Sequence, residues 1–313
     1  MARFVVEDEA VGGRADRFLG DKLPGRGRRR LGEAFERGHV RVNGRAARKG
    51  QVLHAGDVVE VVDDAPELAT AEERRPVPQP ELPLEVVQVD EAIVALAKPA
   101  GMPSHPLAAG ERGTLANALV ARHPECAAAG ADPREGGLVH RLDAGTSGVI
   151  VAARTAPVWT TLRAAFHEGR THKVYLALVA GEVTREGELD APIAQDRRHP
   201  GRVIVCADDV EASRRGALPA RTHWQPEQRF PGYTLLRCEL TTGRMHQIRA
   251  HLAFAGTPVV GDDVYGDLGR PPGLVGHFLH AVRLELAHPV TGAPLSLEAP
   301  LPDDRQSLLA RLK

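Results

Sequence analysis

The chain has 313 residues, of which 42% are hydrophobic and 26% are charged, a composition typical of a folded globular protein with room for two domains. Its cysteines, Cys126, Cys206 and Cys238, form no C-x-x-C pair, which argues against a disulfide framework or a thiolate zinc site and favours the cytoplasm. The chain begins without the apolar core of a signal peptide, and no window approaches 18 uninterrupted apolar residues, so neither secretion nor a membrane partner is expected.

A formal net charge of −1 hides a strongly basic segment near the beginning of the chain. Residues 14–50 contain twelve Lys or Arg against four Asp or Glu, a local surplus of eight positive charges. A solvated charged face is one interpretation of such a segment. A surplus this large in so few residues instead favours a module that binds a polyanion.

The same segment carries the signals of a small α+β module. Apolar residues recur at helical spacing in "RADRFLGDKL" (14–23) and "RRRLGEAFERG" (28–38), which predicts two short amphipathic helices. The stretch "HVRVNGR" (39–45) predicts a strand ending in an Asn-Gly turn, and "AGDVVEVV" (55–62) predicts another strand.

Residues 12–62 resemble the small RNA-binding domain that is named after a ribosomal small-subunit protein. The family commonly has Ser before the arginine that opens the second helix, where this chain has Gly27. The resemblance implies that residues 1–63 form an RNA-binding module. The basic residues expected to contact RNA are Arg17, Arg28, Arg29, Arg30 and Lys49.

A proline-rich stretch follows the basic module. Residues 64–83, "DAPELATAEERRPVPQPELP", contain five prolines and scattered charge, which predicts a semi-rigid linker. Residues 84–313 then mix short alternating strands with a few helices, which indicates one α+β domain around a central sheet. No Gly-rich phosphate loop or dinucleotide fingerprint occurs in this part of the chain.

Residues 138–151, "LVHRLDAGTSGVIV", place an acidic residue between two apolar runs. The pattern predicts two strands joined by a loop. Asp143 could initiate the turn through its own side chain, and this stretch alone favours that interpretation over a chemical role.

Further along, "TAPVWTTLRAAFHEG" (155–169) predicts a helix capped by Thr155, and "RTHKVYLALVAG" (170–181) predicts a strand with Lys173 and Tyr175 on one face. By itself a Tyr beside a Lys on a strand is more often structural than functional.

The stretch "TTGRMHQIRAHLAFAGTPVVGDDVYG" (241–266) predicts a turn and then a helix that ends at Gly256 and Pro258. Its apolar stripe is Ile248, Leu252 and Ala255, with His246 and Arg249 on a neighbouring polar face. A metal site built on His246, His251 and Asp262 is disfavoured, because H-x-x-x-x-H spacing separates the two histidines by about 140° around a helix.

Taken in order, six segments resemble the catalytic domain of the RluA-type pseudouridine synthases. They are "KPAGMPSHP" (98–106), "GTLANAL" (113–119), "HRLDAGTSGVIVAA" (140–153), "KVYLALVAG" (173–181), residues 241–266 quoted above, and "LHAVRLELAHPVTG" (279–292). The resemblance implies a catalytic domain over residues 84–313, built around a mixed and mainly antiparallel sheet. It also implies isomerisation of uridine to pseudouridine in RNA without a cofactor or a metal.

The resemblance carries roles to matching positions. Asp143 is implied to be the catalytic carboxylate, Tyr175 to contact the target base and Arg249 to pair with Asp143. Arg141 is implied in holding the flipped-out nucleotide, and the other residues expected to bind substrate here are His140, Lys173 and His246. The family usually has a basic and then an acidic residue after the catalytic Asp, where this chain has Ala144 and Gly145, so a contact made there is expected to be missing.

These residue types suit the chemistry. An ionised carboxylate near the sugar can act as a nucleophile on the anomeric carbon or as a base for a neighbouring sugar proton, and the sequence leaves both open. Arg249 can stabilise that charge in a water-poor pocket by bidentate pairing. Tyr175 can stack on the detached uracil while its hydroxyl lies near the departing proton.

Several alternatives accompany this interpretation. Large-subunit ribosomal RNA is the preferred substrate, because family members with such an N-terminal module mostly act there, and transfer RNA is the alternative. A catalytically silent RNA-binding protein is a second alternative. A hydrolase using Asp262 and Asp263 is disfavoured, since adjacent residues usually point apart. The protein is expected to be a monomer.

Overall fold

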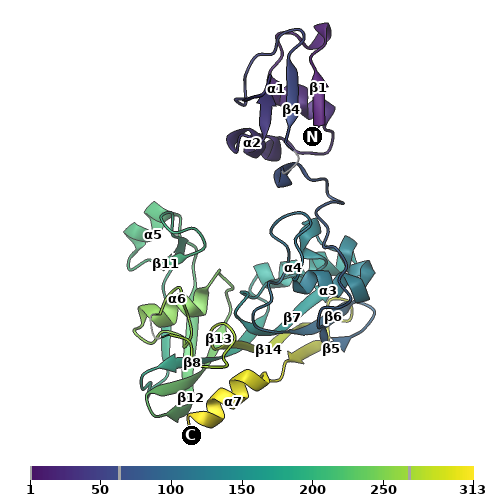
Figure 1. The fold of residues 1–313 in the computed structure, drawn as a ribbon. Helices are drawn as coiled ribbons and strands as arrows, with labels where there is room; N and C mark the ends of the chain where they lie inside the picture. Colours follow the sequence, from purple (N-terminus) through teal and green to yellow (C-terminus); the bar gives the residue numbers. More distant parts are fainter. Residues whose placement is uncertain (1, 63–64, 267–268) are drawn as a thin grey trace. The chain divides into compact units, whose positions relative to one another are not determined.

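The computed structural model describes residues 2–62, 65–266 and 269–313, which form two compact units (Figure 1). One unit comprises Met1–Arg75 with Leu107–Glu111, and the other comprises Pro76–Pro106 with Arg112–Lys313. The division after Arg75 lies inside the predicted linker. Residues 63 and 64, where that linker was predicted to begin, lie outside the described residues.

The first unit is a small antiparallel sheet covered by two helices. Its strands have the order β1 (Ala2–Val5), β4 (Val58–Val61), β2 (Val40–Val42), β3 (Arg45–Ala46). The helices are α1 (Ala15–Lys22) and α2 (Arg28–Glu36), and a short 3-10 helix, η1 (Asp8–Ala10), precedes them. Asn43 and Gly44 both have positive φ, as the predicted Asn-Gly turn requires.

Apolar residues at helical spacing form the core of this unit, as the sequence predicts. Phe18 and Leu19 of α1 and Leu31 and Phe35 of α2 pack in one cluster with the strand residue Val59. The apolar faces of two short helices are therefore buried on the sheet, while their arginines are left at the surface.

The proline-rich segment is more ordered than a linker alone would be. Pro66–Leu68 forms the 3-10 helix η2, and Leu68 is buried in the core of the first unit. In the second unit Gln79 is buried, and its side chain accepts a hydrogen bond from the Gly113 N–H at 2.6 Å.

The second unit is built on a nine-stranded mixed sheet in the part of the chain that the structure describes. Its strands are β5 (Glu85–Val89), β6 (Ile93–Lys98), β7 (Ser147–Ala153), β14 (Leu279–Ala287), β8 (His172–Ala180), β13 (Tyr233–Leu240), β12 (Arg221–Phe230) and β9 (Gly187–Asp190) in spatial order, and β15 (Pro294–Glu298) pairs with β14. The β7–β14 pair is parallel, and the other pairs are antiparallel.

Helices and short connections complete this unit. They are α3 (Leu115–Arg122), η3 (Pro124–Ala128), η4 (Pro133–Glu135), α4 (Ala156–His167), α5 (Asp209–Arg215), α6 (Gln247–Phe254) and α7 (Asp303–Arg311), with a hairpin of β10 (Ile193–Gln195) and β11 (Val203–Val205). None of the helices in the described residues is long and apolar enough to span a bilayer.

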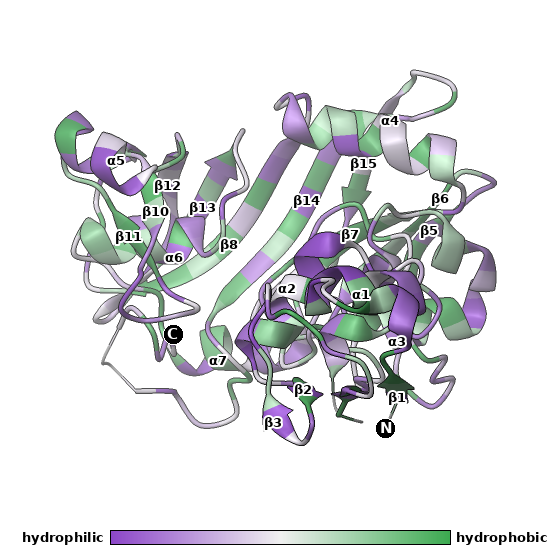
Figure 2. Ribbon diagram, turned by 90° about the horizontal axis from the view of Figure 1, so that it is seen from above, coloured by the Kyte–Doolittle hydropathy of each residue, from purple (hydrophilic) through white to green (hydrophobic). Residues whose placement is uncertain are grey.

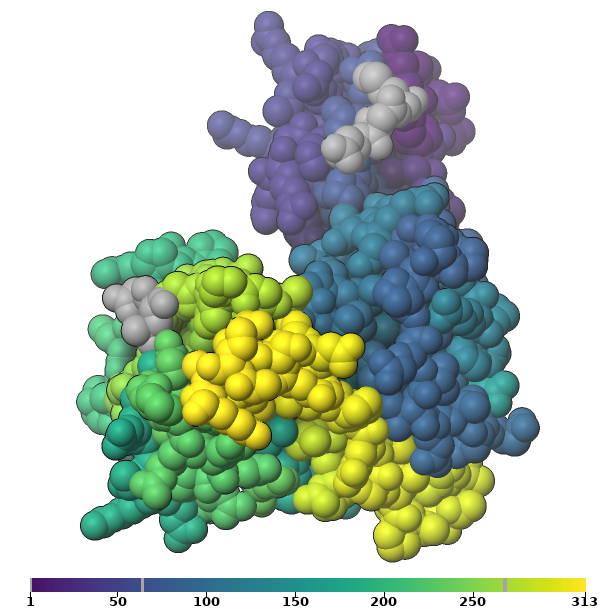
Figure 3. Space-filling model, turned by 60° about the horizontal axis from the view of Figure 1, so that its bottom comes forward, coloured from purple at the N-terminus to yellow at the C-terminus, as the bar shows by residue number. Residues whose placement is uncertain are grey.

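The central strand β8 is buried on both faces. Ala177 and Val179 share one cluster with Ile248 and Leu252 of α6, whereas Leu178 lies in another cluster. That second cluster includes Phe230, Phe278 and Leu308 of α7. Figure 3 shows the C-terminal residues, in yellow, against the green residues of the same unit. Figure 2 shows β8 and β14 side by side, with hydrophobic residues along much of β14. Because side chains pack on both faces of β8, the strand is held in place along its length. The cavity described below lies at one end of this strand.

Two local predictions were wrong, and the one for Thr155 was right in position only. Residues 138–142 do not form a strand, and only Leu138 makes an isolated bridge, to Ala152. Thr155 occupies the cap position of α4 without a side-chain hydrogen bond. Ala255, assigned to an apolar stripe, is exposed because α6 ends one residue earlier.

Candidate active site

Asp143 lies in the turn that leads into β7, and it forms the turn with its main chain. Its carbonyl oxygen accepts a hydrogen bond from the Thr146 N–H at 3.0 Å. The side chain takes no part in this turn and instead accepts a hydrogen bond from Nη1 of Arg249 at 2.9 Å. The prediction that the Asp143 side chain initiates the turn is therefore wrong, because the main chain forms the turn and the carboxylate points to Arg249.

The backbone on either side of Asp143 is held by buried polar groups. Oγ of Ser104 accepts from the Leu142 N–H at 3.1 Å and donates to the Leu142 carbonyl at 2.7 Å. After Asp143, Nζ of Lys98 donates to the Ala144 carbonyl at 3.2 Å, and Nη2 of Arg305 donates to the Gly145 carbonyl at 3.2 Å. These bonds fix the backbone from which the carboxylate projects.

Close packing explains why the residue at position 145 is glycine. A Cβ atom at Gly145 would lie 2.9 Å from the ring of His277, and one at Gly276 would lie 2.6 Å from the Gly145 Cα. The acidic side chain usual at this position in the family therefore does not fit unless the 276–277 segment moves. The His277 ring forms a 2.8 Å hydrogen bond with Thr146, and burial lowers the pKa of His277 to about 3.

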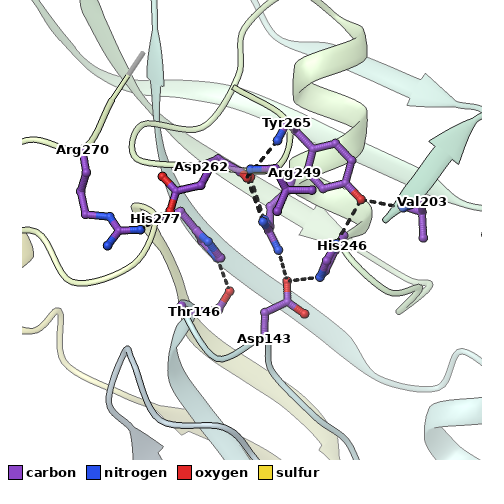
Figure 4. Close-up of polar contacts among 12 residues, drawn as sticks. Asp143, Thr146, Val203, His246, Arg249, Asp262, Tyr265, Arg270 and His277 are labelled. Atoms are coloured by element: carbon purple, nitrogen blue, oxygen red, sulfur yellow. Dashed lines mark hydrogen bonds and ion pairs between the residues drawn. The ribbon is translucent and has the colours of Figure 1, made fainter. Parts of the chain in front are cut away.

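Arg249 projects from α6 and binds two carboxylates (Figure 4). Besides Asp143, it donates from Nε and Nη2 to the two oxygens of Asp262, at 2.7 and 2.8 Å. The side chain of Arg249 is 5% exposed and that of Asp262 is completely buried. Burial opposes ionisation of Asp262, but the hydrogen bonds from Arg249 hold its pKa below the ordinary value.

Asp262 is in turn fixed by backbone donors. Its Oδ1 accepts from the N–H groups of Val264 and Tyr265 at 2.9 and 3.2 Å. Asp262 therefore locks the plane of the Arg249 guanidinium, so that Nη1 points at Asp143.

The two oxygens of Asp143 have different surroundings. Oδ2 accepts from Arg249 and also lies 3.7 Å from Nε2 of His246. Oδ1 receives no hydrogen bond from any residue in the described ranges. One oxygen is thus held by the protein and the other is available to a ligand.

Asp143 opens on a cavity of about 1120 Å³ at the ends of β8 and β13. Tyr175 lines the same cavity from β8, and burial raises the pKa of its hydroxyl, with Asp143 adding to the effect. The other predicted residues that line it are His140, Arg141, Lys173 and His246. The structure therefore brings seven predicted site residues together around one cavity.

These residues differ in how their polar groups are used. Arg141 is exposed and makes no hydrogen bond or ion pair among the described residues. Nε2 of His140 accepts from the Val151 N–H at 3.1 Å, and its ring stacks on Phe166 at 4.5 Å. Burial lowers the pKa of His140 to about 3, so the ring is neutral and acts as a hydrogen-bond acceptor for the backbone.

Lys173 is also partly engaged. Its Nζ donates to the Thr242 carbonyl at 3.1 Å and lies 5.6 Å from the centre of the Phe166 ring. Burial, followed by repulsion from Arg244, lowers its pKa to about 8. His246 lies at the N-cap of α6 with a positive φ of 55°, a region that residues other than glycine rarely occupy.

The remaining predicted residues belong to the first unit. Arg17, Arg28 and Arg29 are exposed, and Arg30 is half-buried. Arg29 pairs with Glu33 at 3.1 Å, and the Lys49 ammonium lies beside Gly32 of α2. Each belongs to a surface of that unit rather than to the cavity.

Sequence reasoning missed the roles of Asp262, Tyr265 and His277. Asp262 was considered only as a metal ligand or as half of an acid pair. The bidentate pairing predicted between Arg249 and Asp143 was wrong, because Arg249 makes that pair with Asp262 and gives Asp143 a single hydrogen bond. The signal that could have found Asp262 was Arg249 itself, because a guanidinium has more hydrogen-bond donors than one carboxylate can accept. Tyr265 contacts both His246 and Arg249, as Figure 4 shows.

The geometry agrees with rejection of the two rival sites. His251 bonds to Thr222 and to the Ala191 carbonyl. Asp262 is buried against Arg249, whereas Asp263 is exposed and pairs with Arg270. Adjacent carboxylates therefore have unrelated surroundings.

A half-buried carboxylate held by arginine beside an open cavity is an arrangement that suits an active site built on a fixed Asp. The family model described as RNA pseudouridylate synthase matches residues 92–254. The ribosomal large subunit pseudouridine synthase D of Xanthomonas campestris pv. campestris is 38% identical, over all of this chain and 93% of that protein. An uncharacterized RNA pseudouridine synthase of Chloroflexus aurantiacus is 39% identical, over 99% of this chain and 93% of its own length.

Solved structures agree in fold. The human RNA pseudouridylate synthase domain containing 4 protein has a TM-score of 0.57 and 24% identity, covering 73% of this chain and 92% of that structure. The corresponding human domain containing 1 protein has a TM-score of 0.54 and 24% identity, covering 70% and 84%. The chain belongs to the RNA pseudouridine synthase family, and its activity is the isomerisation of uridine in RNA.

Proposed function

We propose that this enzyme converts uridines of large-subunit ribosomal RNA to pseudouridine, with Asp143 as the catalytic carboxylate. The relatives named ribosomal large subunit pseudouridine synthase D support the choice of RNA, since they match nearly the whole chain. The observation that carries the role of Asp143 is its asymmetry: Arg249 holds Oδ2, whereas Oδ1 has no hydrogen-bond donor among the described residues.

In the reaction, the bond between N1 of uracil and C1′ of the sugar breaks and the uracil turns over. C5 then bonds to C1′, loses its proton, and N1 gains one. Oδ1 of Asp143 is the atom that attacks C1′ or removes a neighbouring sugar proton, and the geometry suits both steps. The nucleotide must leave its helix or loop to reach this oxygen.

Arg249 orients this carboxylate and gives it a positively charged partner. The guanidinium lies within hydrogen-bond distance of Oδ2 and stabilises negative charge on the carboxylate. Because Asp262 binds two other nitrogens of the same guanidinium, only Nη1 is offered to Asp143.

Tyr175 is the proposed contact for the base. Its ring offers a flat face to the detached uracil, and its hydroxyl is placed to assist departure of the C5 proton. The raised pKa of Tyr175 keeps this hydroxyl protonated in the resting enzyme.

Four further residues are proposed to bind the nucleotide. Arg141 is the free cation at the cavity among the described residues, and it suits a phosphate or the flipped-out nucleotide. Lys173 and His246 line the same cavity, and His140 supports its lining through a hydrogen bond to the backbone. The base and the phosphate of the nucleotide can thereby contact different side chains, a guanidinium, an ammonium and an imidazole.

The first unit is proposed to be an RNA-binding module of the ribosomal small-subunit protein type, followed by the catalytic domain after the proline-rich linker. The exposed arginines of α2 support this role, since Arg28 and Arg29 project to solvent rather than into the core. Such contacts neutralise phosphates and position the enzyme without reading bases. Arg17, Arg30 and Lys49 would extend the same surface.

The proposal is tested by tritium release from RNA labelled at C5 of uridine. Large-subunit ribosomal RNA, small-subunit ribosomal RNA and transfer RNA are each offered to the purified enzyme, with Asp143→Asn as the inactive control. We expect release from large-subunit RNA above the other two. Preferential release from transfer RNA would replace the substrate assignment, and binding without release from any RNA would favour a catalytically silent protein.

A further inference from the structure

Tyr265 joins three parts of the site. Its hydroxyl oxygen lies 2.8 Å from the Val203 nitrogen of β11 and 3.0 Å from Nδ1 of His246 (Figure 4). The Tyr265 ring lies edge-on to His246, with centres 5.6 Å apart, and 5.3 Å from the guanidinium carbon of Arg249. One side chain therefore contacts both groups that face Oδ2 of Asp143.

The donors and acceptors in this chain of contacts can be assigned. The Val203 backbone group is an N–H and can only donate, so the Tyr265 oxygen accepts from it. The single hydroxyl proton of Tyr265 then has one acceptor within the described residues, Nδ1 of His246. A neutral imidazole that accepts at Nδ1 carries its proton at Nε2.

The opposite tautomer leaves two groups unsatisfied. With the proton on Nδ1, His246 would donate to Tyr265, and the Tyr265 hydroxyl would lack an acceptor in the described part of the chain. The Nε2 lone pair would also face the Oδ2 lone pairs of Asp143 across 3.7 Å. Burial lowers the pKa of His246 despite the nearby Asp143, so the neutral form is the relevant one.

We propose that Tyr265 is a positioning residue that fixes His246 as the Nε2–H tautomer, with this N–H directed at Oδ2 of Asp143. Two N–H groups, from Arg249 and His246, then face the same oxygen, and Oδ1 remains for the substrate. The inference deepens the proposed function, because it matters for turnover only if Asp143 is the reacting carboxylate. The tautomer itself can be observed without turnover.

The first test is nitrogen NMR of the full-length protein labelled at histidine, with the His246 signals assigned by their loss in His246→Ala. In the unaltered protein, His246 should show a protonated Nε2 and an unprotonated Nδ1. In Tyr265→Phe, which keeps the ring, the signals should move toward a mixture of tautomers. Tyr233→Phe removes a hydroxyl elsewhere and should leave them unchanged. An Nδ1–H tautomer in the unaltered protein, or no change in Tyr265→Phe, would overturn the inference.

The second test separates Tyr265 from a general structural role. Tyr265→Phe should lower kcat at saturating RNA about tenfold with KM nearly unchanged, the effect of losing one hydrogen bond in a buried site. In a His246→Ala background the same substitution should change kcat less than about twofold, since its effect passes through His246. Equal losses in both backgrounds would show that Tyr265 acts by another route. Normal turnover of Asp143→Asn would instead refute the proposed function and leave the tautomer result standing.

Discussion

In the first unit the side chain of Arg29 is 92% exposed and pairs with Glu33 one helical turn away, whereas in the second unit Arg249 is 5% exposed and binds two carboxylates. An exposed pair of the first kind contributes about 0.3–0.5 kcal/mol and is screened by salt. Removing one partner of a buried pair costs about 3–5 kcal/mol. Arginine therefore forms a weak, salt-sensitive ion pair at the surface of the first unit and a strong ion pair of fixed geometry in the interior of the second.

This difference also predicts how each unit responds to mutation. If the first unit binds RNA as proposed, its surface arginines should contribute additively to affinity, because each would contact a phosphate independently. The buried charges form one connected set, so a change in one alters the others. The five predictions below test this contrast, from the largest expected effect to the smallest.

The largest effect is expected from Asp143→Asn. The amide has the same shape but can be neither nucleophile nor base, so tritium release should fall by more than about 1,000-fold while RNA binding persists. Asp263→Asn is the matched control, because that carboxylate is exposed and, among the described residues, pairs with Arg270. Residual turnover above a few per cent in Asp143→Asn would remove Asp143 from its role.

Arg249→Ala should lower both activity and stability. It leaves Asp262 as a buried charge without its partner, so the free energy of unfolding in urea should fall by about 3–5 kcal/mol and turnover by about two to three orders of magnitude. Adding Asp262→Asn should restore part of the stability but none of the activity.

Arg249→Lys provides a finer test of the same set, since an ammonium cannot bond to Asp262 bidentately and also reach Asp143. Near-normal turnover with lysine would show that the fork geometry is unimportant.

Tyr175→Phe should have a smaller effect on turnover than the substitutions at Asp143 and Arg249. The ring remains to stack on uracil, so cleavage and rotation should continue while loss of the C5 proton slows by about 10–100-fold. A larger isotope effect on release of the C5 hydrogen is the expected observation. If Phe and Ala at position 175 were equally impaired, the hydroxyl and the ring could not have separate roles.

The smallest effect on turnover is expected from replacing Arg28, Arg29 and Arg30 together with Ala. Affinity should fall for all RNA sequences, and the slope of log affinity against log salt should flatten by roughly 2–3 units if all three contact phosphates. Turnover at saturating RNA should stay within about twofold. The triple Lys variant keeps the charge and should keep the slope. An unchanged slope in the Ala variant would mean that these arginines face solvent in the complex.

Local patterns predicted much of the fold. The two helices of the first unit and its Asn43-Gly44 turn follow from spacing and from the positive φ that glycine and asparagine tolerate. The apolar run at 138–142 misled, because only its first residues, Leu138 and Val139, meet β7, whereas the backbone of Leu142 is satisfied by Ser104. Periodicity detects burial more reliably than it detects hydrogen-bond partners.

The site was less accessible to sequence reasoning than the elements that carry it. Asp143, Tyr175 and Arg249 were identified through resemblance, and each pattern alone favoured a structural interpretation. Asp262 and Tyr265 were missed because their importance lies in contacts with Arg249 and His246, more than ten residues away along the chain. Such contacts depend on tertiary packing, for which spacing along one helix gives no signal.

The position of β14 has a consequence for the speed of folding. This strand, residues 279–287, lies between β7 and β8, which follow one another along the chain more than 90 residues earlier. Strands β7 and β8 therefore each lack one neighbouring strand until β14 joins the sheet. The long chain segment between β8 and β14 must close into a loop before the contacts of β14 can stabilise the sheet. Until then both strands present unpaired edges, which are the part of a folding intermediate most prone to join another chain. We expect refolding to be slow and its yield to fall as protein concentration rises.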